Sequence, residues 1–161
     1  MPKRRQHTHV GPEFFTAAPV RVVTTRELPT DAATAFRCLA DGDAWKQWLG
    51  IDVTWTSEPG PGATRTVISG GQQLDEHFFV WEPAERMAFR LDASSLPVTA
   101  FAEDYVLSST GPSSCQLAWT VAVDGNPIVA RAVAAALKLM AIRSLPKLAN
   151  LLRDEPARWA A

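Results

Sequence analysis

The sequence predicts an α+β domain in which one strand, two short helices and six further strands precede a single long helix. β-Branched residues alternate from residue 20 onward, and Gly- and Pro-containing turn signals then recur every 8–14 residues. After the last of these turns, apolar residues follow a helical period through residues 127–153. Short strands separated by such turns are typical of an antiparallel meander rather than of βαβ units. Because one helix cannot cover the concave face of seven strands completely, we expect the fold to enclose a cavity.

The composition is that of one folded domain. The chain has 161 residues, of which 47% are hydrophobic and 20% are charged, with a net charge of -1. This charge offers no general attraction to nucleic acid, and no apolar run reaches the ~20 residues of a membrane-spanning helix. The start lacks the apolar segment of a signal peptide, and Cys38 and Cys115 lack the spacing of a metal or redox site. We therefore expect a cytoplasmic protein with no cofactor, no metal and no nucleic-acid partner.

The first eighteen residues show no sustained period, which predicts a flexible N-terminal arm at 1–18 and a single domain at 19–156. His7 and His9 in this arm are spaced so that they could chelate a metal. Because no third ligand accompanies them, we do not assign a metal site there.

The elements of the domain follow from alternation, capping residues and turns. Alternating β-branched residues predict a strand over 20–28. Asp31 is a suitable N-cap for a short helix at 32–39, and a second short helix at 44–49 carries two tryptophans on one face. Turn signals then separate six strands, predicted at residues 51–58, 63–69, 72–81, 85–93, 98–108 and 115–123.

A long helix is predicted at the C-terminus. Asn126 is a favourable N-cap residue and Pro127 suits the first helical position. We expect Pro146 to kink the helix, since proline removes one backbone hydrogen bond. The stripe expected to face the sheet consists of Val133, Leu137, Met140, Ser144, Leu148 and Leu151.

A second apolar line runs along the same helix, flanked by basic residues on both sides. A helix on a sheet buries one face, so this line indicates a homodimer interface, contact with an anionic membrane, or ordinary surface tolerance of small aliphatic residues. The line consists of Ile128, Ala132, Ala135, Leu139 and Ile142.

Five stretches carry a family resemblance: residues 26–41, the tryptophans at 45 and 48, the turn at 60–65, the strand and turn at 74–86, and the strand at 115–119. In order and spacing they resemble the polyketide cyclase/dehydrase and lipid-transport family of the START and birch-pollen-allergen (SRPBCC) superfamily, over residues 19–153. The resemblance implies a helix-grip fold: a seven-stranded curved antiparallel sheet wrapped around the long C-terminal helix, with two short helices between strands 1 and 2. It implies little about activity, because this fold hosts transporters, receptors and enzymes.

Few residues are candidates for acid–base chemistry. Alternation places Glu76, Phe78 and Val80 on one face of their strand, and the resemblance turns that face inward and His77 outward. An inward Glu76 needs a partner such as Arg65, Arg90 or a hydroxyl group. Glu103 and Tyr105 share a face of their strand, so the candidate catalytic residues are Glu76, Glu103 and Tyr105.

Six Trp and seven Phe against one Tyr provide much apolar surface with few polar groups. This inventory favours a protein that binds a hydrophobic small molecule, either a lipid or an aromatic, polyketide-like compound, in a cavity of at least ~300 Å³. The alternatives are a polyketide cyclase, aromatase or dehydratase that uses the acid–base candidates, and an interaction module whose interior is filled. The expected ligand-binding residues are Phe36, Glu76, Phe78, Phe89, Phe101, Tyr105, Trp119, Leu137, Met140 and Ser144.

Overall fold

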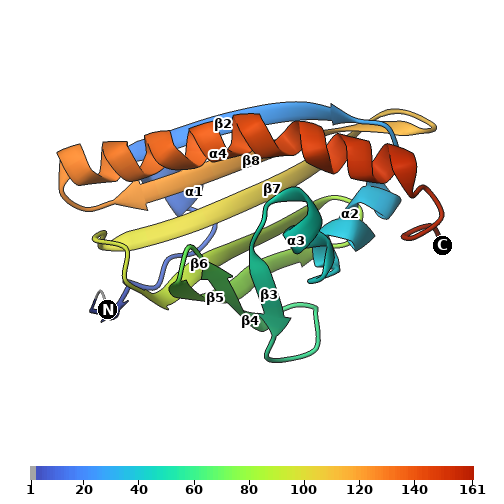
Figure 1. Ribbon diagram of the computed structural model, residues 1–161. Helices are drawn as coiled ribbons and strands as arrows, with labels where there is room; N and C mark the ends of the chain where they lie inside the picture. The colour runs from blue at the N-terminus through green and yellow to red at the C-terminus, as the bar shows by residue number, and fades with distance from the viewer. Residues whose placement is uncertain (1–2) are drawn as a thin grey trace.

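The computed structural model describes residues 3–161 and confirms the predicted α+β helix-grip fold (Figure 1). Every predicted strand and helix is present, with ends that differ from the predicted ones by a few residues. The elements of the domain are β2 (Val20–Leu28), α2 (Ala32–Ala40), α3 (Ala44–Trp48), β3 (Asp52–Trp55), β4 (Thr64–Ser69), β5 (Gln72–Glu82), β6 (Arg86–Ser94), β7 (Ala100–Gly111), β8 (Ser114–Asp124) and α4 (Pro127–Asp154).

The strands form one antiparallel sheet in the order β2-β8-β7-β6-β5-β4-β3. Helix α4 lies across the concave face and packs mainly on β2 and β8 (Figure 1). Helices α2 and α3 cover the end of the sheet near the C-terminus, and α3 also contacts α4. The space between α4, α3 and the strands β4 to β7 is therefore where a site can form.

The N-terminal segment is not a free arm, which corrects the prediction for residues 5–18. Arg5–Gln6 forms a short strand, β1, that pairs with β6, and a one-turn helix, α1 (Phe14–Ala17), follows it. Phe14 and Phe15 are buried on the convex face, against a group of small side chains that lets two aromatic rings approach the sheet: Ala88, Ala100, Ala102 and Ala122. The segment is held by this apolar contact, which its lack of sequence period concealed.

His7 fixes the same segment by hydrogen bonds. Its ring nitrogen Nδ1 lies 3.1 Å from the carbonyl oxygen of Val98, and Nε2 lies 2.7 Å from Oγ of Ser94. Only 4% of His7 is exposed, and this burial lowers the pKa of the imidazole below its usual 6.5. The two nitrogens are thus already occupied, so His7 and His9 do not form the chelate considered from the sequence.

Acid should loosen the N-terminal segment. Because the folded state lowers the pKa of His7, it binds fewer protons than the unfolded state, and stability is lost as the pH falls below 6.5. The N–H groups of His7 and Thr8 donate to the carbonyl oxygens of Asp92 and Thr99. After correction for the intrinsic exchange rate at each pH, exchange at these two amides should be severalfold faster at about pH 5 than at neutral pH. The variant His7→Gln cannot titrate, so an equal acceleration in that variant would contradict the assignment. His9→Gln controls for the neighbouring imidazole.

Helix α4 turns a different face to the sheet than predicted. Asn126 Oδ1 accepts hydrogen bonds from the N–H groups of Ile128 and Val129, as expected of an N-cap, and the helix continues through Pro146 to Asp154. Alanines dominate its buried first half because they allow close approach to β2 and β8. The buried residues are Ala130, Ala134, Ala141, Ser144, Leu145, Leu148, Ala149 and Leu152. Of the predicted stripe, Val133, Leu137, Met140 and Leu151 are only half-buried, at the edge of the contact.

A bulge in β5 corrects the predicted alternation of that strand. The register with β6 shifts between Phe78 and Val80, so one extra residue interrupts the pattern. Before the bulge, Glu76 and Phe78 point inward as predicted. After it, Val80 packs on the convex face and Trp81 contacts Phe78 inside, with ring centroids 5.4 Å apart.

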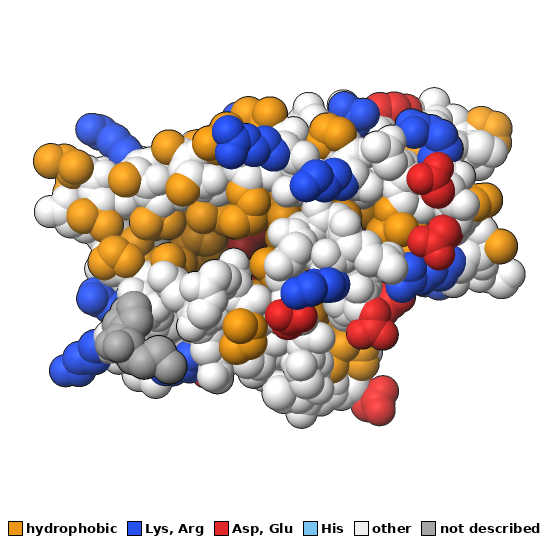
Figure 2. Space-filling view, viewed as in Figure 1, with side chains coloured by type: hydrophobic (Ala, Val, Ile, Leu, Met, Phe, Trp, Pro, Cys, Tyr) orange, Lys and Arg blue, Asp and Glu red, His pale blue; other side chains and the backbone are white. Residues whose placement is uncertain are grey.

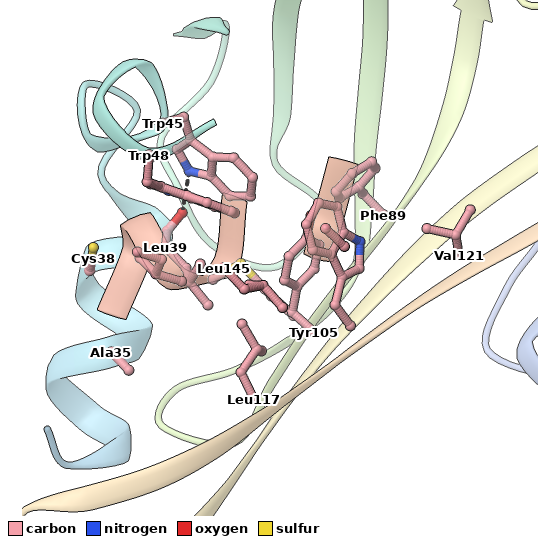
Figure 3. Close-up of a cluster of buried hydrophobic side chains, with 14 of the residues drawn as sticks. Ala35, Cys38, Leu39, Trp45, Trp48, Phe89, Tyr105, Leu117, Val121 and Leu145 are labelled. Carbon is pink, nitrogen blue, oxygen red and sulfur yellow. Dashed lines mark hydrogen bonds between the residues drawn. The ribbon is translucent and has the colours of Figure 1, made fainter. Parts of the chain in front are cut away.

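A cluster of large buried side chains lies where α2 and α3 meet the sheet (Figure 3). Trp45 donates a hydrogen bond from Nε1 to the carbonyl oxygen of Leu39 at 2.9 Å, which fixes α3 relative to α2. Trp48 packs on Trp45 with ring centroids 4.7 Å apart and on Trp119 at 6.0 Å. This aromatic cluster closes one end of the interior.

Candidate functional site

A small cavity of about 60 Å³ lies between the sheet and α4. Figure 2 shows the corresponding hollow, which is bordered by hydrophobic side chains and has acidic side-chain atoms inside it. Its walls are mainly aromatic and aliphatic, and their polar groups include those of Arg65, Ser69, Glu76 and Glu103 and the hydroxyl of Tyr105. The lining residues are Trp45, Leu49, Ile51, Arg65, Val67, Ser69, Leu74, Glu76, Phe89, Glu103, Tyr105, Trp119, Leu137 and Met140.

The cavity is smaller than predicted. Its 60 Å³ falls well below the ~300 Å³ at which ligand pockets usually begin, so the predicted volume is wrong for this conformation. Large side chains fill most of the space between the sheet and α4. They include Trp45, Trp119 and Arg65, each no more than 2% exposed. A ligand of more than a few heavy atoms therefore requires lining side chains to move.

Two strands bring the polar groups of the cavity together. Arg65 on β4 lies directly opposite Glu76 on β5, and its Nε donates a hydrogen bond of 2.5 Å to Glu76 Oε2. The two residues are 1% and 5% exposed. The predicted inward orientation of Glu76, with a cationic partner, is thus confirmed. Arg90, the other arginine considered for this role, pairs with Asp92 instead.

The register that pairs Arg65 with Glu76 originates in a tight turn. Gly70 and Gly71 form a two-residue connection between β4 and β5, with φ of 56° and 79°. Positive φ at both positions is typical of a type I′ hairpin turn, which glycine adopts without strain. Ser69 then pairs with Gln72, and four steps further along each strand Arg65 meets Glu76.

The guanidinium group of Arg65 is enclosed by aromatic rings. Its Cζ lies 4.5 Å from the centroid of the Trp45 ring and 4.9 Å from that of Phe78, and the rings of Trp55 and Phe89 are each at 5.3 Å. These contacts stabilise a cation that is almost fully removed from water. One buried nitrogen, Nη1, has no hydrogen-bond partner within residues 3–161.

Glu103 is the centre of a second polar group. Its Oε1 accepts a hydrogen bond of 2.9 Å from the hydroxyl of Tyr105 and one of 2.6 Å from Nε1 of Trp119. The rings of Tyr105 and Trp119 are stacked, with centroids 5.2 Å apart. Both donors are therefore held toward a single carboxyl oxygen.

Burial changes the protonation of both acidic groups. It raises the pKa of Glu103 to about 8, and the nearby charge of Glu76 adds to the shift. Burial also raises the pKa of Glu76, an effect that Arg65 opposes through its charge and its hydrogen bond. At neutral pH, Glu103 is therefore mostly a neutral carboxylic acid, and Arg65 is the cation that faces Glu76.

The structure brings together only some of the residues expected from the sequence. Phe36, Phe78, Phe101 and Ser144 are buried but do not line the cavity: Phe78, for example, lies beneath it against Trp55 and Phe89. His77 faces outward as predicted, with Nδ1 3.6 Å from Asp92. The expected residues that do line the cavity are Glu76, Phe89, Tyr105, Trp119, Leu137 and Met140, together with the catalytic candidate Glu103.

Seven residues that line the cavity are not among those expected from the sequence: Trp45, Leu49, Ile51, Arg65, Val67, Ser69 and Leu74. The sequence predicts Arg65 only as one possible partner for Glu76, although the Gly70–Gly71 turn sets the register that pairs the two residues. Because side chains alternate along a strand, Val67 and Ser69 on β4 then point to the same side as Arg65, into the cavity. No comparable signal indicated that α3 and the residues after it form a wall.

Two features of the described chain concern metals and membranes. Among residues 3–161 no group of three or more His, Cys, Asp or Glu side chains is arranged to hold a metal ion. No helix in the same range is long and apolar enough to cross a membrane.

The curved sheet, the helix across it and the cavity between them define a helix-grip fold. The chain belongs to the family described as polyketide cyclase / dehydrase and lipid transport, which matches residues 19–153. A protein of Mycobacterium tuberculosis described as uncharacterized is 42% identical over 160 residues, covering 94% of each chain. The family predicted from the sequence is thus confirmed.

Solved structures with low sequence identity share the fold. A START superfamily protein from Mycobacterium smegmatis superimposes with a TM-score of 0.68 at 16% identity, covering 82% of this chain and 98% of that one. The Zhui aromatase/cyclase from Streptomyces sp. R1128 does so with a TM-score of 0.72 at 13% identity, covering 86% and 96%.

Proposed function

We propose that this protein binds a hydrophobic small molecule that is uncharged and carries an oxygen hydrogen-bond acceptor, such as a ketone, enone or ester. The observation that carries the proposal is the buried Arg65 Nη1, an N–H donor without a partner among residues 3–161 on a side chain that lines an apolar cavity. Leaving a buried donor unpaired costs about 1–3 kcal/mol, which a ligand acceptor can recover.

The charges around the cavity favour a neutral ligand over an anionic one. The cation of Arg65 is already compensated by Glu76 at 2.5 Å. Glu103, with its pKa raised to about 8, is mostly neutral at pH 7 and adds little negative charge. A carboxylate ligand would introduce an unpaired charge into a site of low polarity, which is costly.

The wall formed by α4 is where the site can enlarge. Leu137 and Met140 line the cavity and are only half-buried, at the edge of the helix–sheet contact. Methionine has an unbranched, flexible side chain that adopts other rotamers at low cost. Movement of these two side chains would admit a ring-sized molecule without displacing the aromatic cluster at the other end.

Three small probes of nearly equal shape test the proposal: acetophenone, ethylbenzene and benzoate. We expect acetophenone to bind about tenfold more tightly than ethylbenzene, because only the ketone accepts a hydrogen bond from Arg65. Benzoate should bind more weakly than acetophenone. Chemical-shift titration by NMR would measure all three. Equal affinity for acetophenone and ethylbenzene would contradict the role of Arg65, and native mass spectrometry of protein from its own host would identify the natural ligand.

Met140→Trp should abolish binding of acetophenone, since the larger side chain fills the cavity. Leu139→Trp is the matched control, because Leu139 is the adjacent residue on α4 and is 47% exposed rather than lining the cavity. The same NMR titration, with a thermal melt of each variant, would separate blocked binding from unfolding. Undiminished binding by the Met140→Trp protein would place the ligand elsewhere.

The second candidate function is that of a polyketide cyclase, aromatase or dehydratase. Glu103 favours it, because a carboxylic acid with a pKa of about 8 can donate and accept a proton near neutral pH. Glu103, Tyr105 and Glu76 all line the cavity and would be its acid–base groups. A β-hydroxy ketone that loses water to give the enone is a suitable substrate, and Glu103→Gln would remove such activity while leaving acetophenone binding intact.

A further inference from the structure

The outward side of α4 carries a line of exposed apolar side chains, which we call the outer stripe: Ile128, Ala135, Leu139 and Ile142. Its three large members are 78%, 47% and 52% exposed, in that order. The helix packs on the sheet through its opposite side, so nothing in residues 3–161 covers the outer stripe. The stripe spans about four turns of α4.

Basic side chains border the outer stripe on both sides. From residue 127 to residue 153 the chain contains no acidic residue and these basic ones: Arg131, Lys138, Arg143, Lys147 and Arg153. Arg131, Arg143 and Lys147 are exposed, whereas Lys138 donates a hydrogen bond to the carbonyl oxygen of Val23. Figure 2 shows Lys and Arg side chains over α4 with hydrophobic side chains between them. The net charge of the whole chain is only -1, so this positive charge is local.

We propose that the outer stripe docks α4 flat on an anionic lipid membrane. A helix with an apolar line and a Lys/Arg-rich border lies in the plane of a bilayer interface, with its aliphatic side chains among the headgroups and its cations next to anionic lipids. A bilayer surface does not require a partner of complementary shape. A stripe of three large aliphatic residues and one alanine, without a pocket, is therefore sufficient to contact it.

A second copy of the chain fits this surface less well. In a two-fold dimer the same patch faces itself, so Arg131, Arg143 and Lys147 of one subunit would approach those of the other. Like charges brought together in this way oppose association. An anionic membrane instead supplies the complementary charge.

The docked orientation would also bring the cavity close to the membrane. The hollow that corresponds to the cavity and the outer side of α4 are visible on the same face of the molecule (Figure 2). The inference stands independently of the proposed ligand, because it concerns the opposite side of α4 from the one packed on the sheet.

Vesicle pelleting with the full chain tests the proposal. We expect binding to vesicles of mixed phosphatidylcholine and phosphatidylglycerol, and about tenfold weaker binding to phosphatidylcholine alone. Raising the salt concentration should weaken binding to the mixed vesicles. The double variant Leu139→Glu/Ile142→Glu should bind the mixed vesicles at least tenfold more weakly than the unmodified protein does. The variant Arg143→Glu/Lys147→Glu keeps the apolar residues but should also bind the mixed vesicles about tenfold more weakly.

Ile68→Glu is the matched control, since Ile68 is an aliphatic residue 40% exposed on β4, away from α4. It should bind vesicles like the unmodified protein. Equal binding of the Leu139→Glu/Ile142→Glu variant and the unmodified protein would overturn the proposal, as would a lack of binding to either vesicle. Sedimentation that shows a dimer abolished by the same variant would assign the stripe to a second copy instead. Acetophenone binding by this variant should be unchanged, which separates the outcome from that of the proposed function.

Discussion

Replacing Arg65 with methionine should lower the free energy of unfolding by about 3–5 kcal/mol at neutral pH. The variant leaves Glu76 buried, 5% exposed, without the cation that lies 2.5 Å from it. Methionine approximates the volume of the arginine side chain, so the loss reports charge and hydrogen bonding more than packing. Urea denaturation of the variant and the unmodified protein would measure the difference.

The double variant Arg65→Met/Glu76→Leu is the decisive control for this prediction. Removing both charges eliminates the unpaired carboxylate, so the double variant should regain most of the lost stability. Burial raises the pKa of Glu76, and the single variant lacks the cation that opposes this shift, so the variant should be less impaired at acidic pH than at alkaline pH. Equal losses in the single and double variants at both pH values would show that packing around Arg65, rather than its pairing with Glu76, stabilises this part of the core.

The fold could be predicted from the sequence because its signals are local and repeated. Turn residues mark the ends of strands, and Asn126 with Pro127 marks the start of α4, as the structure confirms. The N-terminal segment has no such signal. It is held by Phe14 and Phe15 against alanines that lie far away in the sequence, and a contact of this kind leaves no periodic pattern in either partner.

The site could be predicted only in part, because it depends on register and on side-chain packing. Alternation together with the family resemblance placed Glu76 inside, but pairing with Arg65 required the register set by the Gly70–Gly71 turn. The bulge after Phe78, which brings Trp81 inside, interrupts a pattern that otherwise continues unbroken in the sequence.

The face of α4 was mispredicted because apolar residues lie almost all around that helix. Large side chains suggested Leu137 and Met140 for the buried side, whereas close contact with β2 and β8 selects the alanines Ala130, Ala134 and Ala141. The volume of the cavity depends on the same contacts, because it is the space that the packed side chains do not fill. A sequence pattern does not show how much space packing leaves, so the predicted cavity is larger than the observed 60 Å³.

Replacing Glu103 with glutamine should stabilise the protein, and by an amount that grows with pH. The folded state raises the pKa of Glu103 from the usual 4.5 to about 8. Between these values the folded state binds more protons than the unfolded state, so the stability of the unmodified protein falls as the pH rises through this window and levels off above pH 8. Glutamine cannot ionise, and its oxygen can still accept the hydrogen bonds from Tyr105 and Trp119. At about 1.4 kcal/mol per pKa unit, the advantage of the variant should reach roughly 5 kcal/mol above pH 8 and vanish near pH 4.5.

Urea denaturation across this pH range would measure the effect, with two controls that separate its causes. Glu58→Gln alters an exposed carboxylate and should leave the pH dependence unchanged. Glu103→Leu removes the ionisable group together with the acceptor, so its stability should share the pH dependence of Glu103→Gln but be lower than that of Glu103→Gln at every pH, because two buried donors are left unpaired. If Glu103→Gln and the unmodified protein instead show the same slope of stability against pH, then Glu103 is ionised in the folded state at neutral pH. The cavity would then hold an uncompensated negative charge, and a cationic ligand would suit it better than a neutral acceptor.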